Sequence, residues 1–588
     1  MFDKTCLNPQ ELASATGSLA IHDCLGLRAR LHPDKVLFTL LDDDGAEQQR
    51  LTYGQLYGRA SAIARRLHSH SRPGDRVALF FPQGLEFIAS FLGCLLAGRI
   101  AVPVNLPTRR RVERCLKILD DSGSRLLLVA ESERPALREA FARSSAEGLA
   151  LLSPTSECDA EASWSRPEDN DPQRTAFLQY TSGSTSAPKG VIVSHANISA
   201  NLRMMRDAWA LDHTSDFVTW QPHHHDMGLI LGQLLPIVLG NHTVILSPAT
   251  FVRQPLVWLQ AIARYRARLA GGPNFAYNLA VERYDARRLE GLDLSCWTHA
   301  LNGADVVRPA SLTRFAECYG AHGFAASAFL PCYGLAEATL FVSGGPHGRP
   351  VRTLSADPQA LALEQRLRRP VDPANAQVLV GCGEPSWEVQ VAIVDPATRQ
   401  RCEIGQIGEI WLRGPAIARG YWQNPEATEA GFRARLDDGS EHHWLRTGDL
   451  GFVEEQDRQL YIGGRLKDLI ICEGRNLHPE DIEHTVIEAL RDARPQSCAV
   501  FSHDNEQQRQ TLVAAIELNR ELKRWLRDDP RQLKATVRGA VTDSHGVTLN
   551  RIVFVQPTSI HKTTSGKIQR GKMRQLYLAA QLELLDDA

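Results

Sequence analysis

A loop rich in glycine and hydroxyl side chains is the clearest place for chemistry in this sequence. It runs from Thr181 to Gly190 (TSGSTSAPKG), between apolar segments that predict strands at Thr175–Tyr180 and Val191–Val193. Glycines let backbone N–H groups approach an anion, and hydroxyls add neutral donors. Lys189 adds a positive charge suited to phosphate. We therefore expect a phosphate-binding loop, and the missing GK[ST] ending excludes a Walker A loop.

The alternative for this segment is a flexible linker rich in serine and glycine. Linkers are not flanked on both sides by strand-type sequence, so anion binding is the favoured interpretation. The side chains and backbone groups expected to hold phosphate are then those of Thr181, Ser182, Gly183, Ser184, Thr185 and Lys189.

Three consecutive histidines followed by an aspartate, His223 to Asp226, invite a metal-binding interpretation. Consecutive residues of an extended segment point alternately to opposite faces. Three adjacent histidines therefore do not converge on one ion, as a tetrahedral metal site would require. We do not expect this segment to bind a metal.

The last candidate is a lysine in a polar loop near the C-terminus. Lys567 follows Thr564-Ser565-Gly566, a turn-forming sequence that indicates a positioned loop. The surroundings leave two other interpretations open, a solvated basic tail and a surface for an acidic partner protein. Both interpretations depend on the other basic residues in the thirteen-residue stretch around Lys567, namely Lys562, Arg570, Lys572 and Arg574.

Together these segments resemble the motifs of the adenylate-forming superfamily. That superfamily includes acyl-CoA synthetases, firefly luciferase, peptide-synthetase adenylation domains and fatty acyl-AMP ligases. The loop TSGSTSAPKGV resembles its phosphate-binding signature, and six further motifs follow in the family's order. They are PHHHDMGLI (222–230), LNGAD (301–305), YGLAEAT (333–339), TGDL (447–450), GRLKDLII (464–471) and KTTSGK (562–567).

The resemblance implies a site for ATP. Tyr333 and Gly334 match positions that pack against adenine. The other side of the base is assigned to the family's second glycine-containing motif, here Gly303, Ala304 and Asp305. The phosphates fall to the loop described above.

The same resemblance implies contacts for the ribose and for Mg²⁺. Asp449 matches an aspartate that accepts hydrogen bonds from both ribose hydroxyls, a task suited to an ionised acceptor. Arg465 matches a second ribose contact. Taken alone, TGDL also fits an ordinary turn. Glu337 matches the magnesium-binding carboxylate, a hard oxygen ligand of the kind Mg²⁺ prefers, and Thr185 is the second expected metal contact.

Lys567 matches the lysine that a mobile C-terminal domain brings to ATP. A carboxylate attacks the α-phosphate in this chemistry, so negative charge crowds the transition state. A cation placed there stabilises the transition state more than the ground state. We therefore expect Lys567 to be the main catalytic residue. His225 matches a position near the acyl carboxylate, and Lys467 matches the hinge between the two domains.

One segment favours a particular branch of the superfamily. Between Glu337 and Gly381 lie 43 residues, more than typical acyl-CoA synthetases carry there. Such an insert, about 343–380, resembles the fatty acyl-AMP ligases, which transfer the acyl group to a carrier protein and usually not to coenzyme A. In that branch the insert is thought to restrain the C-terminal domain. The chain departs from the common motif wording at Cys332, Gln221 and His224.

The elements that position these motifs alternate between strand and helix in the first half. This order predicts a parallel sheet with covering helices. The insert is harder to place, and its apolar spacing predicts a short helix over Ala360–Arg369. After residue 464 the pattern changes to a smaller α+β unit. The early predictions are strands at Arg76–Phe81, Ile100–Val104 and Arg125–Ala130, helices at Leu85–Leu96 and Thr108–Asp120, and a loop at Ser153–Asp171.

Composition narrows the functional class. The chain has 588 residues, too many for one domain, and a net charge of −2, which does not suit a nucleic-acid partner. The longest apolar stretches, Phe87–Gly98 and Gly228–Gly240, are shorter than the ~20 residues of a membrane span and read as buried helices. Twelve scattered cysteines without a CxxC pair indicate reduced thiols. No signal peptide is recognisable, so we expect a cytoplasmic enzyme.

The sequence therefore predicts an α/β enzyme with the acyl-CoA synthetase/luciferase-like fold. A large N-terminal domain of layered α/β subdomains covers 1–464, and a small mobile α+β domain covers 465–588. The implied reaction converts a fatty acid and ATP to acyl-AMP and pyrophosphate, then acylates a phosphopantetheine thiol. No phosphopantetheine serine motif follows Lys567, so we expect a carrier protein in trans.

The alternatives are a long-chain acyl-CoA synthetase and a non-catalytic adenylate-binding protein. The insert argues against the first. The joint presence of the expected phosphate, metal, ribose and catalytic residues argues against the second. An amino-acid adenylation domain is disfavoured because no acidic anchor for an α-amino group is apparent.

Overall fold

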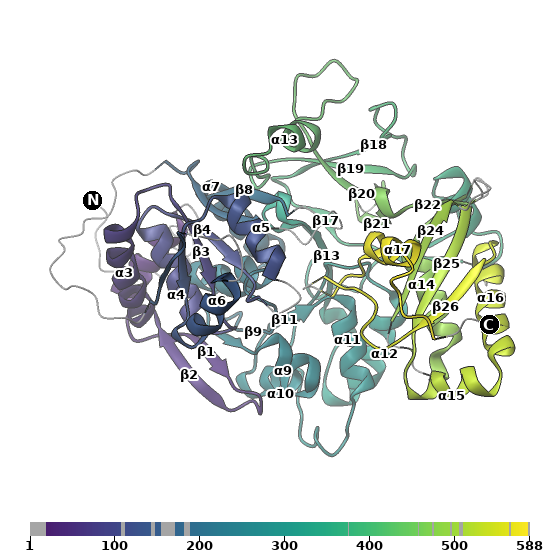
Figure 1. Cartoon of the computed structure of the whole chain (residues 1–588), viewed down its shortest axis with the longest axis horizontal. Helices are drawn as coiled ribbons and strands as arrows, with labels where there is room; N and C mark the ends of the chain where they lie inside the picture. Colours follow the sequence, from purple (N-terminus) through teal and green to yellow (C-terminus); the bar gives the residue numbers. More distant parts are fainter. Residues whose placement is uncertain are drawn as a thin grey trace.

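The computed structural model places two large sheets and two smaller units along the chain (Figure 1). It describes residues 19–107, 112–142, 148–154, 171–180, 188–373, 376–456, 458–472, 475–493, 495, 497–504, 510–563 and 566–585. The predicted phosphate-binding residues Thr181, Ser182, Gly183, Ser184 and Thr185 lie outside these ranges, as does most of the predicted loop Ser153–Asp171.

Six of the described strands form a sheet in the first part of the chain, and five of them are parallel. The sixth, β8, pairs antiparallel with β7. The parallel sheet predicted from the alternating pattern is therefore confirmed. In spatial order the strands are β6 (Ala150–Leu152), β5 (Leu126–Val129), β3 (Arg76–Phe80), β4 (Ile100–Val104), β7 (Thr175–Tyr180) and β8 (Gly190–Ser194).

Side chains alternate across this sheet because successive residues of a strand face opposite sides. Val77 and Leu79 face one apolar cluster, whereas Ala78 and Phe80 face another. Helices α5 (Val112–Ser122) and α6 (Arg134–Ala142) cover the second face, and α3 (Tyr53–His70) and α4 (Leu85–Leu96) cover the first. The predicted strands and the helix Leu85–Leu96 are thus confirmed, and the described part of the predicted helix Thr108–Asp120 is α5.

Nine of the described strands form the larger sheet, with a parallel centre and antiparallel strands at both edges. In spatial order these are β17 (Glu384–Pro385), β14 (Phe341–Gly344), β13 (Phe329–Gly334), β12 (His299–Asn302), β11 (Leu269–Gly272), β9 (Phe217–Thr219), β10 (Thr243–Ile245), β1 (Val36–Leu41) and β2 (Glu47–Thr52). One face packs on four helices, α9 (Pro248–Arg253), α10 (Pro255–Tyr265), α11 (Asn274–Glu282) and α12 (Pro309–Tyr319).

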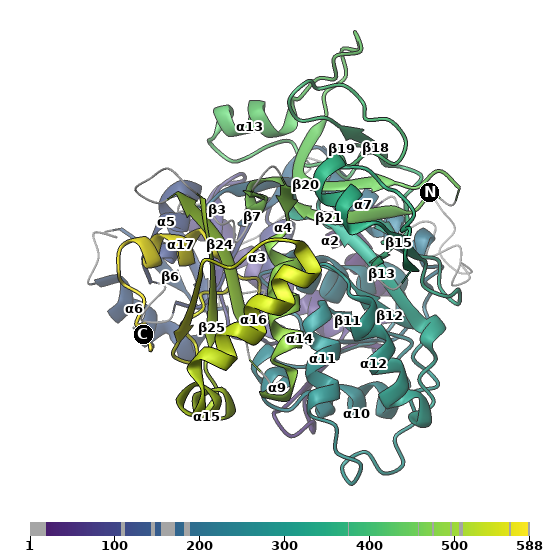
Figure 2. The same ribbon diagram turned by 90° about the vertical axis from the view of Figure 1, so that its right-hand side faces the viewer.

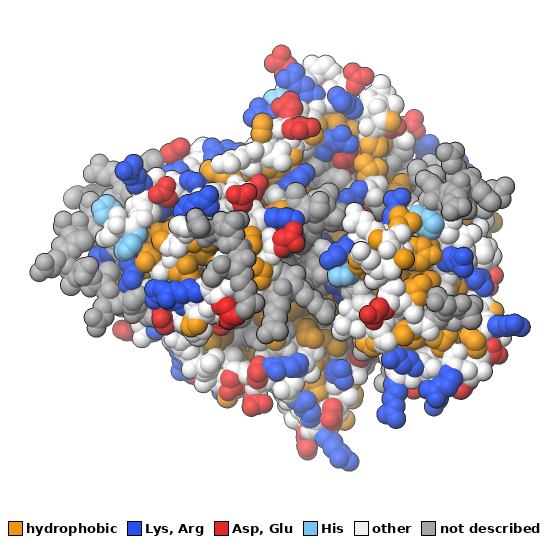
Figure 3. Space-filling model, in the orientation of Figure 1, with side chains coloured by type: hydrophobic (Ala, Val, Ile, Leu, Met, Phe, Trp, Pro, Cys, Tyr) orange, Lys and Arg blue, Asp and Glu red, His pale blue; other side chains and the backbone are white. Residues whose placement is uncertain are grey.

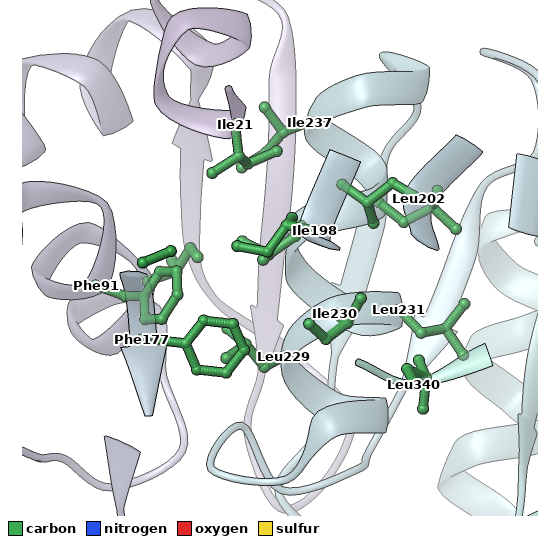
Figure 4. Packing of buried hydrophobic residues seen from close by; sticks show 14 of the residues in the cluster. Ile21, Phe91, Phe177, Ile198, Leu202, Leu229, Ile230, Leu231, Ile237 and Leu340 are labelled. Carbon is green, nitrogen blue, oxygen red and sulfur yellow. The ribbon is translucent and has the colours of Figure 1, made fainter. Parts of the chain in front are cut away.

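A layer of helices separates the two large sheets and forms the main core. Phe91 of α4 and Phe177 of β7 lie on one side of it, and Leu340 lies near the other (Figure 4). Between them pack α2 (Ile21–Leu31), α7 (His195–Ala208), the π-helix η2 (Met227–Leu234) and α8 (Leu235–Leu239). Helix α7 begins after its N-cap residue Ser194, whose side chain accepts from Asn197 N–H.

The apolar stretches Phe87–Gly98 and Gly228–Gly240 are buried, as predicted, in α4 and in η2 with α8. Within the described ranges, no helix is both long and apolar enough to cross a bilayer.

A four-stranded antiparallel unit follows the large sheets in the chain and lies at the top of Figure 1. It carries the TGDL motif on its third strand. Its described strands are β18 (Gln390–Val394), β19 (Gly408–Arg413), β20 (Leu445–Val453) and β21 (Leu460–Arg465), with α13 (Pro425–Phe432) between β19 and β20.

The insert forms a two-stranded hairpin, β15 (Thr353–Ala356) with β16 (Gln377–Val380). The predicted helix Ala360–Arg369 is wrong in extent, because only a π-helical turn, η6 (Ala360–Glu364), forms. Gln365 adopts a left-handed conformation that ends the turn. Beyond it, Arg366 bridges to Gln406 in the neighbouring loop. Pairing with a segment distant in sequence thus overrides the local helical spacing.

The chain beyond residue 469 forms an α+β unit (Figure 2). This unit has two apolar clusters of its own. Cys498 and Val500 of its sheet face α14 and α16, whereas Ala499 and Phe501 face α17. Its elements are β22 (Ile470–Cys472), β23 (Arg475–Leu477), α14 (Pro479–Ala489), β24 (Cys498–Asp504), β25 (Gln510–Glu517), α15 (Arg520–Asp528), α16 (Pro530–His545), β26 (Arg551–Val555) and α17 (Arg570–Leu578). The α/β class predicted for the whole chain is confirmed.

Candidate active site

One cavity of about 2150 Å³ lies where the large sheets, the four-stranded unit and the C-terminal unit meet. The predicted site residues come from distant positions in the chain, and every one that the structure describes lines this cavity. They are Lys189, His225, Gly303, Ala304, Asp305, Tyr333, Gly334, Glu337, Asp449, Arg465, Lys467 and Lys567. The fold therefore gathers motifs that are separated by almost 400 residues.

Asp449 stands at the centre of a buried hydrogen-bonded group. Tyr333 Oη donates to its Oδ2 over 2.7 Å, and Arg465 Nε lies 3.0 Å from its Oδ1. Asp449 and Arg465 face each other because they are register partners on β20 and β21. Burial, together with the charge of Asp449, raises the pKa of Tyr333 far above its usual value. The phenol therefore remains a donor, and the carboxylate is held in one orientation.

The turn before Asp449 is also supported from inside the sheet. Glu409, almost fully buried on β19, accepts from Gly448 N–H over 3.1 Å and from Arg446 Nε over 2.9 Å. Gly448 has a positive φ of 70°, a conformation that favours glycine. The TGDL segment is therefore a positioned turn at the end of a strand register.

Two predicted glycines stand where no side chain would fit. A Cβ on Gly334 would lie 1.9 Å from Leu340 O, and one on Gly303 would lie 2.7 Å from Cys332 Sγ. Both distances are shorter than any van der Waals contact. Glycine at these two positions therefore lets the backbone beside Tyr333 pack closely against Cys332 and Leu340.

Glu337 is linked through Tyr421 to Lys189, the last side chain of the predicted phosphate loop. Tyr421 Oη donates to Glu337 Oε1 over 2.9 Å, and Lys189 Nζ lies 5.0 Å from the centre of the Tyr421 ring. Tyr421 was not identified from the sequence. In the sequence, Tyr421 is marked only by its neighbours Gly420 and Trp422, which do not indicate a role. The β-bridge between Tyr421 and Val191 is what brings Tyr421 beside Lys189.

The carboxylate of Glu337 fits a Mg²⁺ ligand only in part. Its Oε1 is engaged by Tyr421, and its second oxygen retains acceptor capacity. Among the described residues, no group of three or more His, Cys, Asp or Glu side chains is arranged to hold a metal. A Mg²⁺ ion beside Glu337 would therefore take most ligands from phosphate oxygens and water, as Mg²⁺ commonly does.

His225 lies at the start of η2, with its N–H bonded to Pro222 O over 3.0 Å. Burial, together with the positive charges of Lys567 and Arg114, lowers the pKa of His225 to about 4. The imidazole is therefore neutral at pH 7. Its neighbour His223 is buried and stacks on Phe87 with ring centres 3.9 Å apart. Of the histidines His223 to His225, only His225 lines the cavity.

Lys567 enters this cavity on a tight loop of the C-terminal unit. Thr563 N–H donates to Lys567 O over 2.7 Å, and Lys567 N–H donates to Thr563 Oγ1 over 3.0 Å. Gly566 has a positive φ of 92° and lies against Phe275 of α11. Burial raises the pKa of Asp226 and of Asp305, and the charge of Lys567 opposes that rise. The ammonium group therefore acts on several cavity carboxyls.

Arg570 is not a solvated surface residue, although it lies in a basic stretch of sequence. It donates to both oxygens of Glu483, over 2.8 and 2.6 Å, and also contacts Glu480 and Asp468. These acids raise the pKa of Arg570 against the opposing effect of burial. Arg570 therefore ties the lysine loop to α14, whereas Lys562, Lys572 and Arg574 are exposed.

Lys467 lies in a short 3₁₀ turn, Leu466–Asp468, between the four-stranded unit and the C-terminal unit. Burial lowers the pKa of Lys467, and the charge of Arg465 adds to that effect. Its backbone thus joins the strand that carries Arg465 to the unit that carries Lys567.

Residues 27–422 match the family model described as "AMP-binding enzyme". The chain belongs to the AMP-binding enzymes. Residues 467–587 of this enzyme also match a model described as "Disco-interacting protein 2-like, AMP domain". The resemblance to the adenylate-forming superfamily is thereby confirmed.

Over nearly its whole length, the enzyme is similar to fatty-acid ligases and fatty acyl-adenylate ligases. It is 37% identical over 575 residues to the medium-chain-fatty-acid–[acyl-carrier-protein] ligase JamA of Moorena producens, covering 95% of each chain. A Legionella pneumophila fatty acyl-adenylate ligase, solved with acyl adenylate and pyrophosphate, has 35% identity and a TM-score of 0.74 over 96% of this chain and 97% of that one.

A structure from a study of fatty acyl-adenylate ligases of E. coli and L. pneumophila superposes with a TM-score of 0.84. It has 29% identity and covers 96% of this chain and 99% of that one. The predicted acyl-CoA synthetase/luciferase-like fold is thus confirmed, and the most similar branch is that of the fatty acyl-AMP ligases.

Proposed function

We propose that this enzyme activates a fatty acid with ATP to acyl-AMP and pyrophosphate, then transfers the acyl group to the phosphopantetheine thiol of a carrier protein. The observation that carries the proposal is the single cavity that holds Asp449, Glu337, His225 and Lys567 together. Such a cavity has room for a nucleotide and an acyl chain at once.

The nucleotide would bind along the edge formed by β13 and β20. Adenine would lie between Tyr333–Gly334 and Gly303–Asp305, where the glycines allow close packing of the backbone. The ribose hydroxyls would donate to Asp449, whose orientation Tyr333 and Arg465 hold. The phosphates would be bound by the predicted loop residues Thr181, Ser182, Gly183, Ser184, Thr185 and Lys189.

The first step is attack of a fatty-acid carboxylate oxygen on the α-phosphorus. An O–P bond forms, the bond to the β-phosphate oxygen breaks, and pyrophosphate leaves with its electrons. Lys567 would stabilise the charge that builds on the α-phosphate oxygens. His225, neutral and buried, would border the carboxylate without adding a competing positive charge. When bound by Glu337 and Thr185, Mg²⁺ would neutralise charge on the leaving phosphates.

The second step is attack of a thiolate on the acyl carbonyl, with AMP as the leaving group. It needs room for the thiol, so Lys567 has to withdraw from the cavity. We take 1–464 and 465–588 as the moving domains and Lys467 as the hinge. Domain closure and opening of this kind is a common way to separate two steps.

The insert supports a carrier protein as the acceptor. Four of its leucines pack beside the apolar cluster of β20 and β21, together with Leu466 and Leu469 on either side of the hinge. An insert anchored to the hinge would restrain rotation of the C-terminal unit, and restrained rotation would disfavour free coenzyme A. The leucines are Leu354, Leu361, Leu367 and Leu379.

The distribution of charge supports the expectation that nucleic acid is not a partner. On the face shown in Figure 3, acidic and basic side chains are interspersed over most of the surface. The net charge of −2 points the same way. We propose that the enzyme works in the cytoplasm, where ATP and carrier proteins are available.

Mass spectrometry of the products tests this proposal. The purified enzyme is incubated with Mg²⁺, ATP and a panel of fatty acids, with and without coenzyme A. Acyl-AMP that accumulates and persists with coenzyme A supports the ligase function. Rapid acyl-CoA formation would instead identify an acyl-CoA synthetase. No product with any acid would contradict the substrate class and favour a non-catalytic adenylate-binding role.

A further inference from the structure

The backbone of the segment that carries His225 is held by hydrogen bonds from side chains. Residues 221–226 connect β9 of the nine-stranded sheet to η2, and they belong to no strand. Backbone N–H and C=O groups in a buried segment require partners. Here several of those partners are glutamine side chains, where a sheet would supply main-chain groups.

Gln83 bridges two peptide groups of this segment. Its Nε2 donates to Gln221 O over 3.2 Å, and its Oε1 accepts from His223 N–H over 3.2 Å. One side-chain amide thus imitates the donor and acceptor of a neighbouring strand. Gln83 lies in the turn between β3 and α4, and Phe87 of the same helix stacks on His223.

Gln179 holds the next residue. Its Nε2 donates to His224 O over 2.8 Å, and its side chain is 3% exposed. Gln179 is the penultimate residue of β7, so its strand leads directly into the phosphate loop at Thr181. Gln179 and His225 both line the cavity.

The segment is also tied to its own sheet. Gln221 Nε2 donates to Gly271 O of β11, and Gln221 Oε1 accepts from Thr219. Gln221, which departs from the common family wording, therefore serves as an anchor on the nine-stranded side. Gln83 and Gln179 come from the six-stranded side, so the segment is held from both sheets.

We infer that Gln83 and Gln179, named here the glutamine clamp, are positioning residues that set the place of His225 relative to Lys189, which precedes the β8 strand paired with β7. The inference rests on the proposed function, in which the carboxylate near His225 attacks a phosphate held by Lys189. An in-line attack requires the reacting atoms at about 3–3.5 Å. A rigid link between the two subsites would keep that alignment, because misplacement by about 1 Å can cost on the order of a hundredfold in rate.

The main test is Gln179→Met, which keeps length and burial but removes the donor to His224 O. ATP–pyrophosphate exchange with a saturating fatty acid measures the first step. We expect kcat to fall about tenfold or more, with the KM for ATP changed by less than about twofold, because the base and ribose contacts come from other elements. Gln233→Met is the matched control, since Gln233 is 1% exposed in η2 and does not line the cavity. It should retain the kcat of the wild type.

A double variant separates positioning from simple loss of packing. If Gln179 acts through His225, Gln179→Met should add almost nothing to the loss caused by His225→Ala. Multiplied losses, or a wild-type kcat in either single variant, would overturn the inference. Thermal unfolding of each variant checks the fold, and Gln83→Met in its half-buried turn provides a second test if Gln179→Met does not fold. A wild-type enzyme that forms no acyl-AMP would refute the proposed function instead.

Discussion

Arg308 Nη1 lies 2.6 Å from Asp481 Oδ1, and this contact joins the start of α12 to α14 of the C-terminal unit. Gln377 of the insert reaches the other oxygen of Asp481 over 3.3 Å. Burial opposes ionisation of Asp481, but Arg308 and nearby charges outweigh it, so the pKa of Asp481 lies below its usual value. One carboxylate therefore links the large sheet, the insert and the unit that carries Lys567.

Neutralising this link should release the C-terminal unit. Replacing both partners, Arg308→Gln with Asp481→Asn, avoids leaving a single buried charge, which is far more destabilising than losing the pair. We expect acyl-AMP formation to stay within about threefold of the wild type, and transfer of acyl groups from acyl-AMP to free pantetheine to become faster. Single-turnover kinetics with each half-reaction measures both.

Arg314→Gln is the matched control for the link. Arg314 lies on the same helix, and its Nη1 is 3.5 Å from Glu488 Oε1. Both of these side chains are more than a third exposed. Exposed ion pairs contribute little to the stability of a contact. Thiol transfer that is equally slow in the double variant and in the control would show that the link does not limit rotation.

Lys567→Ala should abolish adenylation while fatty-acid binding persists. The side chain supplies positive charge where the transition state gains negative charge, and loss of such a group costs about a hundredfold or more in kcat. Pyrophosphate release measures the rate, and calorimetry measures binding. Lys572→Ala, an exposed lysine of α17, is the control. Normal pyrophosphate release by Lys567→Ala would exclude it as the main catalytic cation.

Asp449→Asn should weaken ATP binding. The substitution removes the charge that Arg465 faces and one of the two strong acceptors for ribose hydroxyls. Hydrogen bonds to a charged group contribute about 1.5–3 kcal/mol, so the Kd for ATP should rise about 10- to 100-fold. Tyr333→Phe removes only the donor to Asp449 and should have a smaller effect. An ATP affinity equal to the wild type in Asp449→Asn, measured by calorimetry, would contradict the ribose assignment.

The insert should influence acceptor choice. Deletion of residues 350–375 is expected to increase use of coenzyme A, because the hinge leucines lose their partners. A milder variant is Leu361→Ser with Leu379→Ser, which keeps the backbone but removes apolar contacts. Val371→Ser is the control, since that side chain is 96% exposed. Product ratios with coenzyme A measure the effect, and an unchanged ratio in a folded variant would count against the insert.

His223 should make stability depend on pH. Burial, reinforced by the charge of His225, lowers the pKa of His223 from 6.5 to about 3. Between these values the unfolded chain binds the proton and the folded chain does not, so stability is fully present above about pH 6.5 and falls as the pH decreases. The slope for one such group is about 1.4 kcal/mol per pH unit.

His223→Phe removes this titration and keeps a ring to stack on Phe87. As the pH falls from 6.5 to 5, the Tm of the wild type should therefore decrease relative to the Tm of this variant. Thermal unfolding at several pH values measures it. A difference independent of pH would mean that His223 is not held neutral in the fold.

Local sequence pattern was sufficient for many elements. The helix Leu85–Leu96 and the strand Ile100–Val104 occur with the predicted bounds, because the helical spacing of the first and the short apolar run of the second depend on near neighbours. The insert shows the limit of this reasoning. Ala360–Arg369 has helical spacing, yet pairing of Arg366 with a distant loop ends the helix at Glu364.

Motif spacing identified the residues of the candidate site, but not their partners. Asp449 and Lys567 were recognisable because their motifs are short and contiguous. Tyr421, Arg308 and Gln179 belong to no such motif, so their roles emerged only when sheet pairing and domain contact brought them beside the site. The same holds for Arg570, which was counted among basic surface residues until Glu483 was seen to bind it.

The sequence by itself therefore determined the family, the α/β class and the chemical groups available for adenylation. Only the tertiary structure decided which of those groups lie together, which charges are paired and how the insert and the C-terminal unit meet. The physical reason is that propensity and motif chemistry act over a few residues, whereas the place of His225 relative to Gln179 and Lys189 depends on how the two large sheets pack with the helices between them.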